Sequence, residues 1–219
     1  MTSTAPTVRP YASADRDQVR DVCYRTGHMG DSPGWYWRDA RSFADIWTGY
    51  YTDREPESSF VAVSGERVVG FLLGCVDSAR APSPAATVTR HLLRRALLLR
   101  PGTAGFFMRS IADTIAGSSV PSGELDDPRW PSHLHINLLP EARGAGAGSA
   151  LMRVWFERLE TLGSPGCHLV TLAENLRAIA FFERSGFTRH GDPVLVPGMR
   201  TVDGDRMHQQ TMVRSIREA

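Results

Sequence analysis

Two neighbouring stretches carry residues whose types and spacing could do chemistry. In the first, glycines stand at alternate positions, 144, 146 and 148, between an apolar run and an amphipathic run. Glycine lets the backbone turn sharply and approach a ligand, and the N-terminus of a helix offers free N–H donors and a partial positive charge. The spacing therefore predicts a strand, a glycine turn and a helix that together bind a phosphate or pyrophosphate.

The strand that precedes this turn, Ser132 to Leu139, carries the candidate catalytic side chains. Its residues alternate between two kinds, Leu134, Ile136 and Leu138 on one face and His133, His135 and Asn137 on the other. A polar face on a central strand indicates that this face lines a cleft, and an imidazole that titrates near pH 7 can act as a base or proton relay. We predict that His135 and Asn137 are catalytic, with His133 a weaker third. The alternative for each histidine is a hydrogen-bonded structural role.

Composition narrows the classes of function. The chain has 219 residues, of which 42% are hydrophobic and 22% charged, and its formal net charge is +1. These values favour one globular domain and give no strong field to attract nucleic acid or a membrane. No lysine occurs, so Schiff-base and P-loop lysine chemistry are excluded.

Cysteine usage and hydropathy favour a cytoplasmic protein. The three cysteines are far apart in apolar surroundings, which predicts reduced, buried thiols. No Cys/His cluster predicts a metal site. No apolar run approaches the roughly 18 residues of a membrane span, and the first residues lack the pattern of a signal peptide.

The elements that must position the site follow from hydrophobic periodicity. Before the insert, a strand, two helices and two strands are expected, at about 8–11, 13–26, 42–51, 59–63 and 68–77. After the strand and turn described above come a helix to about 163, a strand, a helix and two strands, at about 167–172, 178–185, 187–190 and 207–213. The chain is thus predicted to be a single α/β (α+β) domain over 1–219. Residues 78–131 form a helical insert between the third and fourth strands, with helices at 87–100 and 106–116.

Two motifs in the C-terminal half carry a resemblance to a known family. Arg143-Gly144-Ala145-Gly146-Ala147-Gly148 matches the turn Q/R-x-x-G-x-G/A of the GCN5-related N-acetyltransferase (GNAT) superfamily. The segment from Asn175 through Ala178, Phe181-Phe182 and Gly186-Phe187 is similar to its N-x-x-A-x-x-F/Y-F/Y-x-x-x-G-F pattern. The resemblance implies a GNAT-like central mixed sheet of about 6–7 strands flanked by helices. More narrowly, the chain resembles the acetyltransferase-like C-terminal domain of O-GlcNAcases.

The resemblance implies acetyl-CoA as the cofactor. The residues that it assigns to cofactor binding are Leu138, Leu139, Arg143, Gly144, Ala145, Gly146, Ala147, Gly148, Ser149, Asn175, Ala178 and Phe182. Main-chain groups of Leu138 and Leu139 would pair with pantetheine as a strand does. Arg143 has an alternative in an ion pair with Glu141 or in a surface position, and Asn175 has one as a helix N-cap.

The resemblance also implies a reaction, in which a primary amine of a small molecule or peptide attacks the thioester directly. Many relatives carry at the position of Phe182 a tyrosine that protonates the departing thiolate, and this chain has no hydroxyl there. A non-catalytic acyl-CoA-binding or partner-recognition module is therefore the alternative. A nucleotide-binding Rossmann protein is disfavoured, because its glycine turn follows the first strand.

The acceptor is less constrained by the sequence. Asp31, Tyr36 and Asp77 are the predicted substrate-binding residues. The aromatic residues at 35–37 and those of the following helix are interpreted either as core packing or as a pocket wall. The expected partners are an amine substrate, with no nucleic acid and no membrane, and the sequence leaves room for a homodimer.

Overall fold

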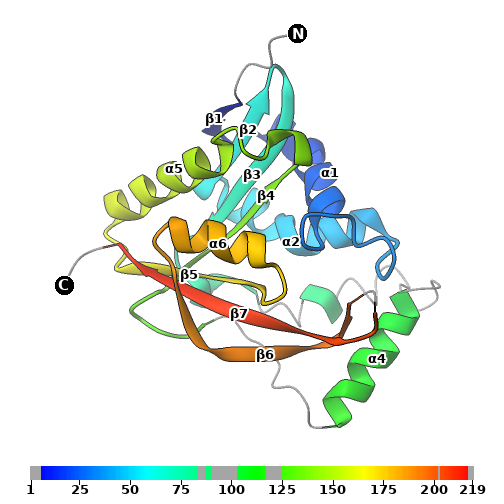
Figure 1. Cartoon of the computed structure of the whole chain (residues 1–219). Helices are drawn as coiled ribbons and strands as arrows, with labels where there is room; N and C mark the ends of the chain where they lie inside the picture. Colours follow the sequence, from blue (N-terminus) through cyan, green and yellow to red (C-terminus); the bar gives the residue numbers. More distant parts are fainter. Residues whose placement is uncertain (1–5, 83–86, 90–102, 117–124, 202, 217–219) are drawn as a thin grey trace.

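The computed structural model describes residues 6–82, 87–89, 103–116, 125–201 and 203–216. Within these residues seven strands form one sheet, in the order β1-β2-β3-β4-β5-β7-β6 (Figure 1). The strands are β1 (Thr7–Pro10), β2 (Ser59–Ser64), β3 (Arg67–Cys75), β4 (Ser132–Leu138), β5 (Gly166–Leu172), β6 (Thr188–Arg200) and β7 (Arg206–Ser215). Only the β4–β5 pair among them is parallel. The predicted fold class, a mixed sheet flanked by helices, is confirmed.

Helices cover both faces of this sheet. The α-helices whose bounds the described residues give are α1 (Arg16–Thr26), α2 (Ala40–Arg54), α4 (Thr103–Ile115), α5 (Ala147–Leu162) and α6 (Leu176–Arg184). Asn137 of β4 is hydrogen-bonded to Thr26 of α1, whereas the next residue, Leu138, lies against Gly148 of α5. Because successive side chains of a strand point to opposite faces, α1 and α5 lie on opposite sides of the sheet. The polar face of β4 is the face that α1 and α2 cover.

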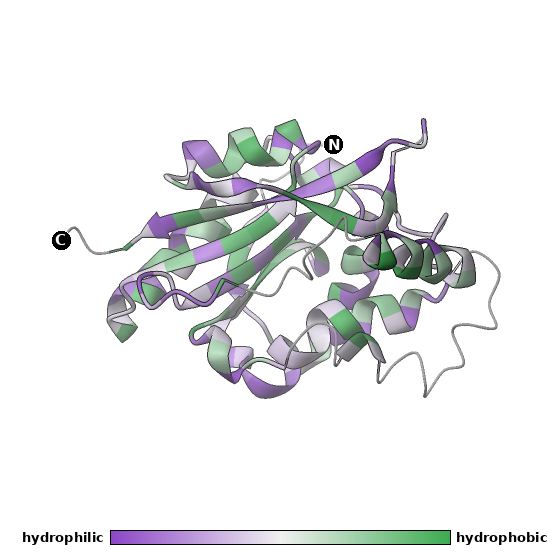
Figure 2. Cartoon of the chain, turned by 90° about the horizontal axis from the view of Figure 1, so that it is seen from below, coloured by the Kyte–Doolittle hydropathy of each residue, from purple (hydrophilic) through white to green (hydrophobic). Residues whose placement is uncertain are grey.

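The core lies between these layers. Figure 2 shows hydrophobic stretches along the middle strands, and mixed hydrophilic and hydrophobic positions along the flanking helices, as amphipathic packing requires. Strand β3 is buried from Val68 to Cys75, and its Gly74 leaves room for the ring of Trp155 on α5. A Cβ at position 74 would come within 2.2 Å of that ring. Gly74 therefore allows α5 to pack close to the sheet.

The sheet is nearly divided at its centre. Strands β4 and β5 are paired only at Ser132 with Cys167 and at His133 with His168. Beyond these residues β4 is paired only with β3, and β5 only with β7. The edge of β4 from Leu134 onward thus faces a gap between two strands of the same sheet.

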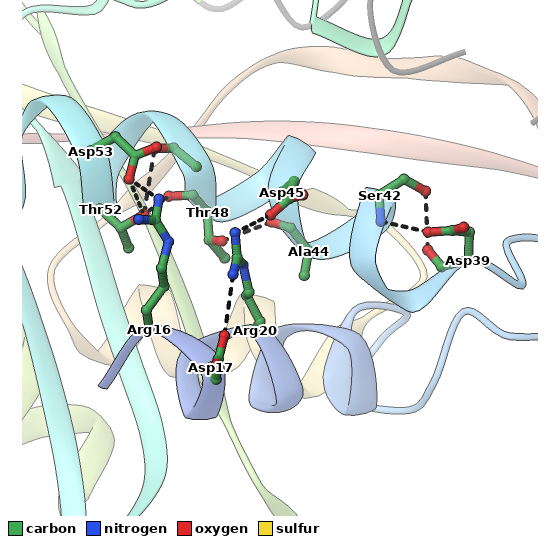
Figure 3. Close-up of polar contacts among 11 residues, drawn as sticks. Arg16, Asp17, Arg20, Asp39, Ser42, Ala44, Asp45, Thr48, Thr52 and Asp53 are labelled. Atoms are coloured by element: carbon green, nitrogen blue, oxygen red, sulfur yellow. Dashed lines mark hydrogen bonds and ion pairs between the residues drawn. The ribbon is translucent and has the colours of Figure 1, made fainter. Parts of the chain in front are cut away.

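Ion pairs hold α1 to α2, the two helices that carry one wall of the site, and a cap fixes the start of α2 (Figure 3). Arg20 of α1 donates to Asp45 of α2 at 2.6 Å, and Arg16 pairs with Asp53. The carboxylate of Asp39 accepts from the N–H of Ser42 at 2.7 Å and so caps the start of α2. These contacts fix which face of α2 points toward β4.

The insert contributes α4, which packs against β6. Asp113 accepts from the N–H of Gly198 and from the guanidinium of Arg200, each at 2.8 Å. These bonds hold the pKa of Asp113 down, at about 2. Of the first helix predicted in the insert, only residues 87–89 are described, and the rest of that prediction lies outside the described residues. The division into one domain with an insert stays a prediction.

Candidate active site

One large cavity, of about 830 Å³, opens where β4 and β5 separate. The glycine turn and α6 line one half of it, and α1, α2 and the loop that follows α1 line the other half. The predicted site residues that line it are Tyr36, His135, Asn137, Leu138, Arg143, Gly144, Gly146, Gly148, Ser149, Asn175, Ala178 and Phe182. This size and mixture of apolar walls with a few polar groups are typical of a small-molecule or cofactor site.

The glycine turn presents free main-chain donors to this cavity. Gly144 and Gly146 have φ of +79° and +80°, a left-handed conformation that side chains disfavour. Helix α5 begins at Ala147, and its first backbone hydrogen bond runs from Ala150 to Gly146. The N–H groups of residues 144–149 donate to no described backbone carbonyl. They form an arc of donors at a helix N-terminus, which fits a phosphate group.

Gly148 has a different role from the other two glycines. It lies inside the first turn of α5, where a Cβ would be 3.1 Å from Phe181 and 3.2 Å from Leu138. Its missing side chain therefore lets α5 approach both β4 and α6. Ala147 is buried beside it, and of the predicted turn residues Ala145 and Ala147 do not line the cavity.

Two arginines flank the turn, and the sequence interpretation named only one of them. Arg143 donates from Nε to the carbonyl of Leu138 at 3.1 Å and from Nη2 to the carbonyl of Gly30 at 2.7 Å. Arg177 donates to the carbonyl of Met29 at 3.3 Å and also lines the cavity. Burial and the nearby Arg177 lower the pKa of Arg143, and an anion would relieve this repulsion. The signal for Arg177 was its place in the first turn of α6, two residues after Asn175.

These arginines hold the tip of a tight turn after α1. His28 and Asp31 exchange backbone hydrogen bonds of 2.8 and 2.9 Å, with Met29 and Gly30 at φ +54° and +95° between them. The left-handed conformation of Met29 costs about 1–2 kcal/mol. Backbone strain of this kind persists where the surroundings enforce it, often at a binding site. Here the two guanidinium groups are the enforcing contacts.

The free edge of β4 supplies main-chain groups to the gap. Leu139 donates its N–H to Val69 of β3 at 2.8 Å, and its carbonyl accepts from Ala142 at 3.0 Å. Because main-chain groups along a strand alternate between its two edges, those of Leu138 and Ile136 point toward β5. The structure thus corrects the prediction for Leu139, whose main-chain groups are both used within the protein and whose side chain is buried.

Helix α6 closes the cofactor half. Asn175 caps this helix by accepting from the N–H of Ala178 at 3.2 Å, so its structural role is present. That bond uses only the side-chain oxygen, and the amide NH₂ remains available as a donor. Phe182 is buried against Phe187, and both Ala178 and Phe182 line the cavity.

His135 lies where the two halves of the cavity meet. Its ring is 5.8 Å from that of Trp47 and 5.2 Å from that of Tyr51, both on α2. Burial, with a contribution from His168, lowers the pKa of His135 to about 4. This corrects the expectation of an imidazole that titrates near pH 7, since His135 is neutral there. A neutral ring can accept a proton, but it is a weak base.

His133 and Asn137, on the same face, have protein partners. Tyr51 Oη lies 2.7 Å from His133 Nε2, and Ser78 Oγ lies 2.7 Å from its Nδ1. His133 does not line the cavity, so the structural alternative describes it. Asn137 donates to Thr26 Oγ1 at 2.8 Å and lines the cavity, and that bond leaves its side-chain oxygen as a potential acceptor.

Of the three predicted substrate-binding residues, only Tyr36 lines the cavity. Tyr36 is buried between the rings of Trp35 and Phe106, and burial raises its pKa, so its hydroxyl stays protonated. The carboxylate of Asp77 instead accepts from Ala79 at 3.1 Å and pairs with Arg80. Asp31 is exposed at the end of the tight turn. We therefore withdraw the acids Asp31 and Asp77 as cavity residues.

No metal site is apparent among the described residues: none of their His, Cys, Asp and Glu side chains gather in groups of three or more that could hold an ion. None of the described helices has the length and apolar character needed to cross a membrane.

Sequence comparison identifies the class of protein. The model of the acetyltransferase (GNAT) family matches residues 27–187, a span that contains the glycine turn, β4, β5 and α6. The chain therefore belongs to the acetyltransferase (GNAT) family, as the resemblance implied.

Two curated relatives are similar to this chain over short segments. A mycothiol acetyltransferase of Geodermatophilus obscurus is 35% identical over 92 residues, which are 40% of this chain and 30% of that protein. A mycothiol acetyltransferase of Streptomyces griseus is 38% identical over 55 residues, 25% of this chain and 18% of the relative. The matches to these curated relatives thus span less than a third of the relatives' own length.

Solved structures are similar over almost the whole chain. The crystal structure of SsHAT has a TM-score of 0.66 and 28% identity, and the match covers 98% of this chain and 100% of that one. The structure of yncA, a putative acetyltransferase from Salmonella typhimurium with its cofactor acetyl-CoA, has a TM-score of 0.58 and 14% identity, over 99% and 96% of the two chains. At that identity the second likeness concerns the fold alone.

Proposed function

We propose that this protein is an acetyl-CoA-dependent N-acetyltransferase that acetylates a primary amine of a small molecule or peptide. One observation carries the proposal: the arc of free N–H groups at residues 144–149, the free edge of β4 and His135 open into the same cavity. A diphosphate fits the arc, and an extended amide chain fits the strand edge. The acetyltransferase relatives and the neighbour solved with acetyl-CoA support this choice of cofactor.

The residues of the turn would hold the diphosphate through main-chain donors, with Arg143 and Arg177 supplying positive charge beside them. Leu138 would pair through its main-chain N–H, because its carbonyl already accepts from Arg143 Nε. The amide NH₂ of Asn175 would donate to the same extended chain. Ala178 and Phe182 give an apolar wall that excludes water. When bound, acetyl-CoA supplies an activated acetyl group as a thioester.

Direct attack by the amine follows from the side chains near the gap. The only cysteine that lines the cavity among the described residues is Cys23, and burial raises its pKa to about 12. It stays a thiol at neutral pH, so an acetyl-cysteine step has no nucleophile. Neutral His135 can accept the proton of the amine, directly or through water, and the side-chain oxygen of Asn137 can orient the amine. Both residues are therefore the proposed catalytic pair.

Calorimetry followed by an amine-dependent assay for free CoA tests the proposal. We expect acetyl-CoA to bind with micromolar affinity and CoA to be released only when an amine is present. His135→Gln should lower kcat while leaving the Kd for acetyl-CoA unchanged. An absence of acetyl-CoA binding by the wild-type protein would contradict the proposal.

A second candidate rests on Phe182. A module that binds acyl-CoA or a partner without transferring the acetyl group needs no proton donor, and position 182 has no hydroxyl. Binding of acetyl-CoA without turnover across a broad set of amines and peptides would favour that module over the enzyme.

Three finer expectations stay predictions. These are the kinship with the acetyltransferase-like domain of O-GlcNAcases, a homodimer and a cytoplasmic location. Sedimentation of the purified protein at several concentrations tests the second of them directly.

A further inference from the structure

The acceptor half of the cavity has an aromatic wall. Trp47 of α2 is 39% exposed, and its ring lies 6.2 Å from Phe43 on one side and 5.8 Å from His135 on the other. Tyr36 lines the same cavity. An exposed tryptophan between a buried phenylalanine and the candidate base offers apolar surface within reach of the reacting nitrogen.

The remaining wall of this half is also largely apolar. Cys23 of α1, Met29 at the tip of the tight turn, Phe71 of β3 and Met199 of β6 line the cavity. Methionine side chains adapt their shape to irregular apolar partners. The wall suits a flat or branched hydrocarbon group.

The charged side chains that line the cavity, among the described residues, have one sign. Among the described residues that line it, the formally charged side chains are Arg143, Arg177 and Arg184, and no aspartate or glutamate is present. The acids nearest in sequence to the aromatic wall are engaged elsewhere: Asp39 caps α2, Asp45 pairs with Arg20, and Asp31 is exposed outside the cavity. A cation in the acceptor half would therefore find no carboxylate among the described lining residues.

The aromatic wall and the absence of described carboxylates select between classes of amine. We propose that the acceptor is a primary amine carried on an aromatic or apolar body, with no second cationic group. The inference rests on the proposed acetyltransferase function and names its substrate class. A diamine or polyamine that placed one nitrogen at His135 would have to desolvate its second ammonium without a counter-ion.

The transfer balances for such an acceptor. The neutral amine nitrogen forms a bond to the acetyl carbonyl carbon, and the carbon–sulfur bond breaks. The nitrogen loses one proton and the sulfur leaves as a thiolate that gains one proton. An N-substituted acetamide and free CoA are the products. His135 Nδ1 or Nε2 is the chain's own site for the proton in transit.

Matched amines on the full-length protein test the proposal. The pairs are 2-phenylethylamine with its 4-aminomethyl derivative, and hexylamine with 1,6-diaminohexane, each assayed for kcat/KM at pH 8. We expect the monoamine of each pair to be favoured at least tenfold, and 2-phenylethylamine over hexylamine. Equal or higher kcat/KM for the diamines would overturn the inference.

Variants at two exposed apolar residues sharpen the test. Trp47→Ala should raise KM for 2-phenylethylamine about tenfold, whereas Leu162→Ala, at a leucine of α5 that is 48% exposed but outside the cavity, should leave it within twofold. Trp47→Glu should shift the preference within each pair toward the diamine. Equal effects of the two alanine substitutions, or no shift with Trp47→Glu, would contradict the proposal.

Calorimetry with acetyl-CoA separates the two levels of failure. No binding means that the proposed function fails, and with it the inference. Binding with turnover of diamines or peptides in preference to apolar amines overturns the substrate class alone. Binding without turnover of any amine overturns the substrate class and favours the non-catalytic module.

Discussion

The two halves of the cavity differ in whether main-chain groups or side chains face the ligand. The cofactor half is made mostly of main-chain groups, namely the N–H arc of residues 144–149 and the free edge of β4. The acceptor half is made of side chains, with Tyr36, Trp47 and His135 as its main features. A site made of main-chain groups tolerates changes of side chain wherever the backbone conformation is kept. In a site made of side chains, a substitution changes the groups that contact the ligand and therefore its specificity.

The substitution that should weaken the cofactor half most is Gly146→Asp. Its φ of +80° disfavours a side chain, and the new carboxylate would lie beside the bound phosphates. Like charges in contact cost several kcal/mol, so we expect the Kd for acetyl-CoA to rise by roughly 100-fold or more in calorimetry. Gly65→Asp is the matched control, because Gly65 also has a positive φ, +60°, but lies in the β2–β3 hairpin outside the cavity. Equal losses in both variants would mean that only folding was affected.

In the acceptor half, the burial of His135 should make the free energy of unfolding depend on pH. Burial keeps the pKa of His135 near 4 in the folded protein, against about 6.5 when unfolded. Between these values the unfolded chain binds more protons, so the free energy of unfolding should fall as pH decreases from 6.5 to 4. His135 accounts for on the order of 3 kcal/mol of this loss. Denaturant titrations of wild type and His135→Gln check this, and the variant should have the flatter pH dependence. If the free energies of unfolding of both proteins changed equally with pH, His135 would not be the source of this pH dependence.

Arg177 contacts both halves of the site, since it donates to the carbonyl of Met29 and lines the cavity together with the glycine turn. Arg177→Ala removes a charge-assisted contact of about 1.5–3 kcal/mol, and we expect the Kd for acetyl-CoA to rise about tenfold or more. The salt dependence of binding should weaken as well. Arg153→Ala is the control, because Arg153 pairs with Glu157 on the exposed side of α5. An unchanged Kd would mean that Arg177 only stabilises the turn at Met29 and does not bind the cofactor.

The smallest expected change is at Phe182. Phe182→Tyr adds a hydroxyl to the wall of the cavity, where it can donate a proton to the departing sulfur. We expect kcat to rise by about threefold to tenfold, with little change in the KM for acetyl-CoA. Steady-state kinetics at saturating amine measure this. An unchanged kcat would mean that water already supplies the proton or that chemistry does not limit turnover.

The contrast between the cofactor half and the acceptor half also explains which features could be predicted from the sequence. The fold and the glycine turn were predictable, because periodicity marks strands and helices and because left-handed positions require glycine. Asn175 and Phe182 were assigned by the match of their segment to the pattern of the family, and both line the cavity. Arg177 was missed because its contacts are to main-chain carbonyls of a turn 148 residues earlier.

The acceptor side depends on contacts that no local pattern encodes. Asp77 had a suitable residue type, but its partners are the neighbouring Ala79 and Arg80. His133 and His135 look equivalent in the sequence, yet Tyr51, 82 residues away, covers the first. The lowered pKa of His135 likewise arises from packing that brings α2 onto β4.

The short β4–β5 pairing has a mechanical consequence. Only two residue pairs join β1–β4 to β5–β7 within the described sheet, so few backbone hydrogen bonds cross its centre. The two half-sheets should open as separate cooperative units in hydrogen exchange, with amides of β4 and β5 beside the gap exchanging early. A ligand that bridges the gap completes the sheet, so saturation with it should slow exchange across both half-sheets together.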